Sequence, residues 1–192
     1  EEISALVHHE DAFVRREAVS ALSWLQQDQA ITILAKIAET DTDDEVRRIA
    51  TGGLAYSQNI SVEVIQALQH SLTSESWQLR VEAAFTIGKL RIVQLEAPLI
   101  HAVSDLYWQV RIAAVRSLGL LKSHLAVAHL TDNFKHEISN LRKEVALALG
   151  EIGTAEAQKL LEQHQNDPDP EVRKAIRIGL NQIGEVKYAN QT

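Results

Sequence analysis

The chain of 192 residues is long enough for one domain or a short array of repeats. It contains no Cys, which excludes disulfides, thiolate metal sites and cysteine nucleophiles, and its 8 Gly and 3 Pro are too few for a turn-rich all-β fold. The formal net charge of −7 disfavours a protein that coats nucleic acid or an anionic membrane.

An aliphatic residue followed by Arg recurs six times along the chain. We call these six residues the repeat arginines: Arg15, Arg47, Arg80, Arg111, Arg142 and Arg173. Their successive spacings are 32, 33, 31, 31 and 31 residues. Seven residues after each repeat arginine stands a Leu or an Ile. This period indicates internal repeats that fill the chain.

Positions are numbered below from each repeat arginine, so that −6 is the sixth residue before it. Apolar residues at −1, +3, +7 and +10 share one face of an α-helix, which predicts a helix B that contains the arginine. In chain order, a preceding helix A is expected over residues 3–7 (truncated), 30–39, 62–72, 96–104 and 155–163. Polar breaks at 40–44, 73–76 and 166–169 separate the two helices. Asp43 and Asp169 are suited to N-caps, and Asp44 and Pro170 to first turns.

A helical hairpin of this kind cannot bury its apolar face alone, whereas stacked hairpins can. The predicted fold is therefore all-α: a right-handed α-solenoid, or superhelix, of about six hairpins in a single domain spanning residues 1–192. We number the hairpins as repeats 1 to 6, with approximate bounds 1–27, 28–59, 60–92, 93–123, 124–153 and 154–184, followed by a tail at 185–192.

The stretch from Asp167 to Gly184 resembles the HEAT-like repeat of the phycobilisome-lyase type, within the armadillo-like helical superfamily. Repeat 4, from Asp105 through Trp108 to Gly119, is similar. The resemblance implies the solenoid fold and a family of bilin-lyase subunits, scaffolds and adaptors. It also implies an Asp at −6 that forms a ladder with the arginines of adjacent repeats, and a structural role for Arg47, Arg111 and Arg173. The −6 residues are His9, Asp41, Ser74, Asp105, His136 and Asp167, so the ladder is expected to be incomplete.

The two ends of the array differ. Position +4 is small or aliphatic until it becomes Arg177, which reads as a polar C-terminal cap, and the tail after Gly184 is expected to fray. Repeat 1 shows no such cap. We therefore expect that a partner covers this end or that the natural chain continues upstream.

Catalysis and cofactor binding are not expected. The His8-His9-Glu10 and His136-Glu137 stretches resemble the His-Glu pairs of the di-iron HEAT-repeat hydroxylase that modifies deoxyhypusine. In that family the pair lies within helix B, where this chain has Arg16-Glu17 and Lys143-Glu144 instead. The pair Gly52-Gly53 lies inside a predicted helix and not in a phosphate-binding loop. We therefore predict no metal, no cofactor and no catalytic residues.

The strongest functional signal is a line of apolar residues on the outward face of helix B in repeats 3 and 4. The predicted partner-binding residues are Trp77, Val81, Phe85, Tyr107, Trp108, Ile112 and Arg116. Basic residues are expected to flank them: Arg16, Arg48, Lys143 and Lys174. Aromatic and Arg side chains are typical of interaction sites. Packing between repeats is the alternative for these residues, and equally for Trp24 and Tyr56.

These features favour a non-catalytic protein-binding or scaffold module, whose partner offers acidic and apolar residues. One alternative is a subunit of a bilin lyase or isomerase, which the resemblance allows. A DNA-binding HEAT-like protein is disfavoured because position +1 is apolar at Val81 and Ile112, where a duplex would lie. No segment is apolar enough to span a membrane, and the cytoplasm is the expected compartment.

Overall fold

The computed structural model describes residues 2–25 and 27–189, and within these residues every regular element is helical. The chain divides into two compact units, Glu1–Leu95 and Glu96–Thr192, which we call unit 1 and unit 2. No helix among the described residues combines the length and the apolar character needed to cross a bilayer.

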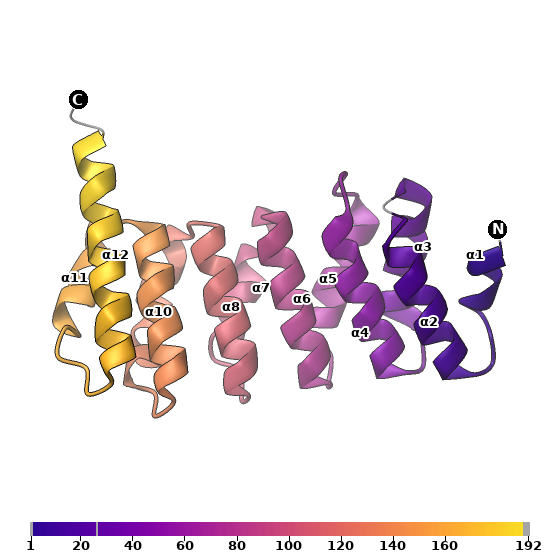
Figure 1. Cartoon of the computed structure of the whole chain (residues 1–192), viewed down its shortest axis with the longest axis horizontal. Helices are drawn as coiled ribbons and strands as arrows, with labels where there is room; N and C mark the ends of the chain where they lie inside the picture. Colours follow the sequence, from indigo (N-terminus) through magenta and orange to yellow (C-terminus); the bar gives the residue numbers. More distant parts are fainter. Residues whose placement is uncertain (1, 26, 190–192) are drawn as a thin grey trace. The chain divides into compact units, whose positions relative to one another are not determined.

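Unit 1 holds three helical hairpins. Its elements are α1 (Glu2–Leu6), α2 (Ala12–Ser23), α3 (Asp28–Thr40), α4 (Asp44–Gly53), η1 (Leu54–Tyr56), α5 (Val62–Leu72), α6 (Trp77–Leu90) and η2 (Val93–Leu95). The B helices α2, α4 and α6 lie side by side in one layer, and the A helices α3 and α5 lie behind them (Figure 1).

Unit 2 repeats this arrangement with a less regular second hairpin. Its elements are α7 (Glu96–Ala102), α8 (Trp108–Leu120), η3 (His124–Ala126), α9 (Val127–Leu130), η4 (Asp132–Lys135), α10 (Ser139–Ile152), α11 (Ala155–Gln163) and α12 (Pro170–Ala189). Here α8, α10 and α12 form the B layer (Figure 1). The helix A expected in repeat 5 is divided into η3, α9 and η4, with the side chain of Phe134 in the core.

The N-caps expected from sequence are present. Asp43 accepts hydrogen bonds from the N–H groups of Glu45 and Val46, and Asp169 accepts them from Glu171 and Val172. These contacts satisfy helix-end donors that would otherwise lack a partner, which fixes where α4 and α12 begin.

Close helix packing explains the small residues at +8. In unit 2, a Cβ atom on Gly150 of α10 would lie 2.5 Å from the Cα atom of Gly179 on α12. One on Gly119 of α8 would lie 3.0 Å from the Cα atom of Ala148 on α10. Larger side chains would force these helices apart, so the small residues set the stacking distance within this unit.

The C-terminal predictions were partly wrong. Arg177 is exposed, as expected of a polar cap, while the equivalent residues of the earlier repeats are buried. However, α12 does not end at Gly184 but continues to Ala189, so the tail does not fray at residues 185–189. Residues 185–189 lack helix-breaking Pro and Gly, which permits this extension. The remainder of the predicted tail, 190–192, lies outside the described residues.

Candidate functional site

The loop before each helix B is organised by the residue at −6. In all six repeats its side chain accepts a hydrogen bond from the backbone N–H two residues later, at distances of 2.8–3.2 Å. Asp and Ser do this through oxygen, whereas His9 and His136 use Nδ1. The His residues therefore replace Asp as turn formers, which explains why the loop persists without the acid.

The repeat arginine closes the same loop from the helix side. In unit 2, Nη1 of Arg142 donates to the carbonyl oxygens of His136 and Glu137 at 2.8 and 3.1 Å. Its Nε and Nη2 donate to the Asp167 carboxylate of the next repeat at 2.8 and 2.9 Å. Arg15 makes the equivalent contacts in unit 1, with Asp41 as the acid. These bidentate pairs are rungs of the expected ladder.

The ladder is incomplete where −6 is not an acid. Arg47 lies in the register that faces Ser74, and it donates instead to the carbonyl oxygen of Ala38 and to the nearby Asp44. Arg111, in the register that faces His136, donates to the carbonyl oxygen of Asp105. Both arginines therefore donate hydrogen bonds to backbone carbonyl oxygens, which supports the structural role expected for them.

The rung in unit 2 is buried and electrostatically strong. Arg142 and Asp167 are both buried. The hydrogen bonds from Arg142 lower the pKa of Asp167 despite the opposing effect of burial, and those to Asp167 raise the pKa of Arg142. Such a pair stays ionised and joined at neutral pH.

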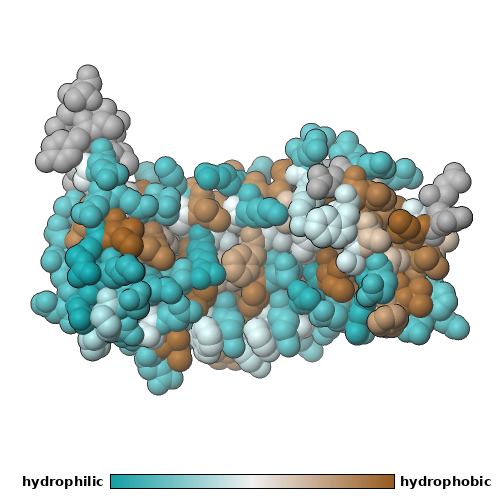
Figure 2. Space-filling model, in the orientation of Figure 1, coloured by the Kyte–Doolittle hydropathy of each residue, from teal (hydrophilic) through white to brown (hydrophobic). Residues whose placement is uncertain are grey.

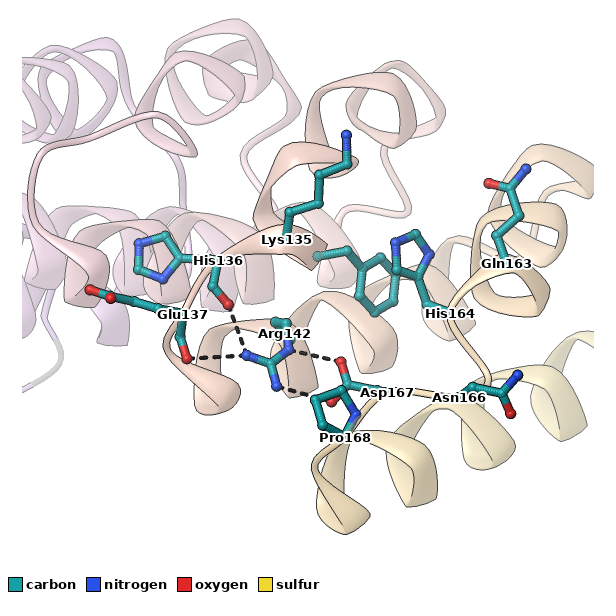
Figure 3. Close-up of a pocket in the computed structure, with 10 residues that line it drawn as sticks. Lys135, His136, Glu137, Arg142, Gln163, His164, Asn166, Asp167 and Pro168 are labelled. Carbon is teal, nitrogen blue, oxygen red and sulfur yellow. Dashed lines mark hydrogen bonds and ion pairs between the residues drawn. The ribbon is translucent and has the colours of Figure 1, made fainter.

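A pocket of about 440 Å³ lies beside this rung in unit 2 (Figure 3). Figure 3 shows Arg142 between the two loop carbonyls and Asp167. The His164 ring stacks on that of Phe134, with 4.3 Å between the ring centroids. A pocket of about 430 Å³ occupies the equivalent place beside Arg15 and His9 in unit 1. Both guanidinium groups are engaged with protein acceptors, so neither pocket offers a free arginine to an anion. Among residues 2–25 and 27–189, no three His, Asp or Glu are grouped to hold a metal ion.

In unit 1, the predicted binding residues lie on α6 at intervals of four, so they share one face of that helix. Phe85 is 42% exposed, while Trp77 and Val81 are half-buried. This face therefore has one exposed aromatic ring beside two partly covered side chains.

In unit 2, the predicted residues lie at the start of α8 and along it. Tyr107 and Trp108 are exposed, at 44% and 36%. Ile112 is only 6% exposed, so its predicted place on the open surface is wrong: it is a buried core residue. Leu106, which was not among the predicted residues, is 93% exposed beside Tyr107. Its position outside the helical period gave no signal.

The predicted basic flank is largely paired with acids. Arg16 lies 2.7 Å from Asp43. Arg116, which belongs to the predicted partner-binding set and not to the flank, lies 2.6 Å from the buried carboxylate of Glu144. Arg48 contacts both Glu45 and Glu82, at 2.7 and 2.9 Å. Lys143 and Lys174 each lie 3.9 Å from a carboxylate, that of Glu144 and Glu171 respectively. The charge of Arg16 and of Arg48 is therefore largely balanced by acids within the protein.

Trp24, left ambiguous by the sequence, is an exposed residue. It is 70% exposed, and its ring lies 5.9 Å from that of Tyr56. The ammonium group of Lys89 lies 4.4 Å from the centre of the Tyr56 ring, in cation–π geometry. These three residues all occupy +9, so this position forms a row of contacting side chains in unit 1.

The family model described as HEAT repeats matches residues 1–55, 64–139 and 135–190. The chain therefore belongs to the HEAT-repeat family, and its fold is an α-solenoid. No curated protein matches the sequence.

Several solved repeat structures share this fold. An engineered protein is 21% identical with a TM-score of 0.71, and the match covers 96% of each chain. A designed armadillo repeat protein in complex with the peptide (KR)4 is 18% identical with a TM-score of 0.71, over 95% of this chain and 98% of that one. Human deoxyhypusine hydroxylase is 20% identical with a TM-score of 0.55, over 95% of this chain and 83% of that one. At these identities the likeness concerns the fold alone.

Proposed function

We propose that the chain is a non-catalytic module that binds a protein segment through aromatic residues of its B helices. The observation that carries the proposal is the exposure of Tyr107 and Trp108 at the start of α8, next to the almost fully exposed Leu106. Large apolar side chains held on a rigid helix end bury much area with little loss of side-chain entropy, as interface residues do.

Phe85 of unit 1, with Trp77 and Val81 beside it, forms a second group of candidate contacts. Several of these residues already contact other parts of the protein. We therefore treat the two groups separately, one in each unit, and propose that each contributes to partner binding.

The partner that fits is a segment with apolar residues and some acidic ones. Arg116 remains partly exposed although it is paired with Glu144, and Lys143 and Lys174 are held by their acids only at 3.9 Å. An acidic partner residue can approach these cations at the rim. Because most of the positive charge is internally paired, we assign the larger part of the affinity to apolar contacts.

A peptide library displayed on phage tests the proposal. We expect the unmodified protein to enrich peptides with apolar residues flanked by Asp or Glu. The Trp108→Ala and Phe85→Ala proteins should each lose at least about tenfold in affinity for them, the scale of one hot-spot residue.

Leu125→Ala is the matched control, because Leu125 is an exposed apolar residue of unit 2 outside the proposed site. Circular dichroism confirms that each variant keeps its helices. Enrichment of no peptide class, or equal binding by the Trp108→Ala and Leu125→Ala proteins, would refute the site.

Two finer predictions belong to this proposal. A second contact is expected at the N-terminal repeat. The resemblance to the phycobilisome-lyase type of repeat, and with it a role as bilin-lyase subunit, stays a prediction that a bilin titration followed by absorbance can test.

A further inference from the structure

The repeats are of two alternating types, which differ at positions +2 and −6. Position +2 is Glu in the odd repeats, at Glu17, Glu82 and Glu144, and it is apolar in the even repeats, at Ile49, Ala113 and Ala175. Position −6 alternates in the opposite sense, with Asp in the even repeats and His or Ser in the odd ones. The building block of the array is therefore a pair of repeats.

The Glu at +2 joins an odd repeat to the even repeat before it. In unit 1, Nη1 of Arg48 in repeat 2 lies 2.9 Å from Oε2 of Glu82 in repeat 3. In unit 2, Arg116 of repeat 4 lies 2.6 Å from Glu144 of repeat 5. The odd-to-even junctions that lie within one unit use the Asp at −6 instead: Arg15–Asp41 in unit 1 and Arg142–Asp167 in unit 2. Each kind of junction thus has its own ion pair.

Repeat 1 is an odd repeat, and its Glu at +2, Glu17, has no cationic partner within the described residues. Glu17 occupies the +2 position of α2, is exposed, and has no ion pair or hydrogen bond through its side chain within residues 2–25 and 27–189. By the register of Glu82 and Glu144, it faces the side from which a preceding even repeat would supply an Arg or Lys.

The surroundings of Glu17 are unusually apolar. Phe13 lies one turn before it on α2 and is 66% exposed, whereas the same position is Glu, Gln or Asn in the other five repeats. The Trp24 side chain remains largely exposed although its ring contacts that of Tyr56. Leu6 and Leu25 are also exposed. In Figure 2, hydrophobic atoms gather over the end of unit 1 where Figure 1 places α1 and α2. Exposed apolar surface around a single carboxylate is typical of an interface.

We propose that this face of α1 and α2 binds a helical hairpin of the even-repeat type. The hairpin would bring an Arg or Lys to Glu17, in the register of either Arg48 or Arg116, and apolar residues to Phe13 and Trp24. This inference rests on the proposed binding function and adds to it a second interface with a defined partner chemistry.

A second copy of this chain would present an even repeat, repeat 6, with Lys174 in the register of Arg48, but the composition of its surface suits the face poorly. The end of unit 2 that such a copy would present is the outer side of α12, where Lys174, Arg177 and Asn181 are exposed. Ile178 is the one large apolar side chain exposed on the described part of that helix, residues 170–185. A surface of this composition can approach Glu17, but it cannot cover Phe13 and Trp24 without burying unpaired charge.

The direct test adds an even-type hairpin to the intact chain. The repeat arginines of repeats 1 and 3, Arg15 and Arg80, lie 65 positions apart. When repeat 1 is aligned with repeat 3, Glu1 therefore corresponds to position 66, which follows repeat 2 directly. A second copy of residues 28–65 joined to Glu1 therefore places repeat 2, with its Arg48, in register before repeat 1. The covalent link supplies a high effective concentration. A second copy of residues 93–127, from repeat 4, joins in the same register and is an independent probe, because Arg15 and Arg142 lie 127 positions apart.

We expect the addition to shield Trp24 and to fold against α2. Acrylamide quenching attributable to Trp24, obtained by difference from the Trp24→Phe protein, should fall at least about threefold. Arg48→Glu in the added copy should lower the melting temperature by about 2–4 °C, the shift typical of a single ion pair in a chain of this size, and Glu17→Arg should restore it.

Three results would overturn the proposal. The first is that both added hairpins remain unfolded by circular dichroism. The second is that Trp24 stays accessible to acrylamide in both extended proteins. The third is that Glu17→Arg does not restore the melting temperature lowered by Arg48→Glu. Concentration-dependent protection of Trp24 in the unmodified chain would assign the face to a second copy instead. Failure of the peptide selection at Trp108 leaves these readouts unaffected, so the two proposals fail separately.

Discussion

Two junctions in unit 2 show how one residue changes the connection between repeats. Asp167 and His136 occupy the same position, −6, and each accepts the N–H of the residue two places later. Asp167 also forms a bidentate pair with Arg142 of the preceding repeat. In the register of His136, Arg111 instead donates to a carbonyl oxygen of its own loop.

The difference teaches that the −6 residue has two separable roles. One is to shape the loop, which any acceptor of suitable reach can do. The other is to join repeats electrostatically, which needs a carboxylate. A His performs only the first, so the fold tolerates His at −6 while that junction depends on apolar packing and on other ion pairs such as Arg116–Glu144.

The largest expected effect comes from removing the buried arginine. Arg142→Ala leaves the Asp167 carboxylate buried without its cation and two loop carbonyls without donors. It should lower the free energy of unfolding by about 3–5 kcal/mol. Arg111→Ala removes a hydrogen bond from the side chain to the carbonyl oxygen of Asp105, and no ion pair within the described residues, so it should cost only about 1 kcal/mol. Urea denaturation at pH 7 measures both, and equal losses would contradict the comparison.

The same junction should depend on pH. Hydrogen bonds from Arg142 lower the pKa of Asp167 in the folded protein. A lowered folded pKa contributes stability above the unfolded value of about 3.9, and this contribution is lost as the pH falls through the folded pKa. Asp167→Asn should therefore destabilise the protein at pH 7, by about 2 kcal/mol, and the difference should shrink below about pH 4. A difference that is constant from pH 7 to pH 3 would show that the charge is not responsible.

A missing rung can be added. His136→Asp supplies a carboxylate in the register of Arg111 and keeps an acceptor for the N–H of Ile138, so it should stabilise the protein by about 1 kcal/mol. His9→Asp is the matched control, because repeat 1 has no preceding arginine in the described structure, and it should give no gain. Thermal unfolding of the two variants distinguishes them; equal effects would mean that loop formation alone is being measured.

The smallest effect is expected at an exposed pair. Lys174 lies 3.9 Å from Glu171, and both side chains are largely solvent-exposed. Lys174→Ala should change the free energy of unfolding by less than about 0.5 kcal/mol. A loss as large as that of Arg142→Ala would show that burial does not separate the two kinds of pair.

The sequence predicted the fold well because repeat spacing and helical period are strong signals. The bounds predicted for the helices at 62–72 and 155–163 are those of α5 and α11, and the Asp43 and Asp169 caps are confirmed. Division of the repeat 5 helix into short pieces was not predicted, since that depends on tertiary contacts of residues such as Asn133, which donates to the carbonyl oxygen of Val103.

The candidate site was less predictable. The 3.6-residue period of apolar residues distinguishes the buried face of a helix from its outward face. It does not show how closely the neighbouring helices approach the outward face. Ile112 was therefore predicted as surface and is core. Likewise, the basic residues at +1 were visible in the sequence. Asp43 and Glu82 pair with Arg16 and Arg48 from adjacent repeats, and these two pairs emerge only when the repeats are stacked.

Binding of one library-selected peptide, measured side by side in the Trp108→Ala and Arg111→Ala proteins, tests the account most directly. We propose that Trp108 belongs to a partner surface, whereas Arg111 supports the loop before its helix. We therefore expect that Trp108→Ala loses at least about tenfold in affinity while keeping its stability, and that Arg111→Ala keeps its affinity with slightly lower stability. Retained binding by Trp108→Ala together with lost binding by a folded Arg111→Ala protein would contradict the proposal.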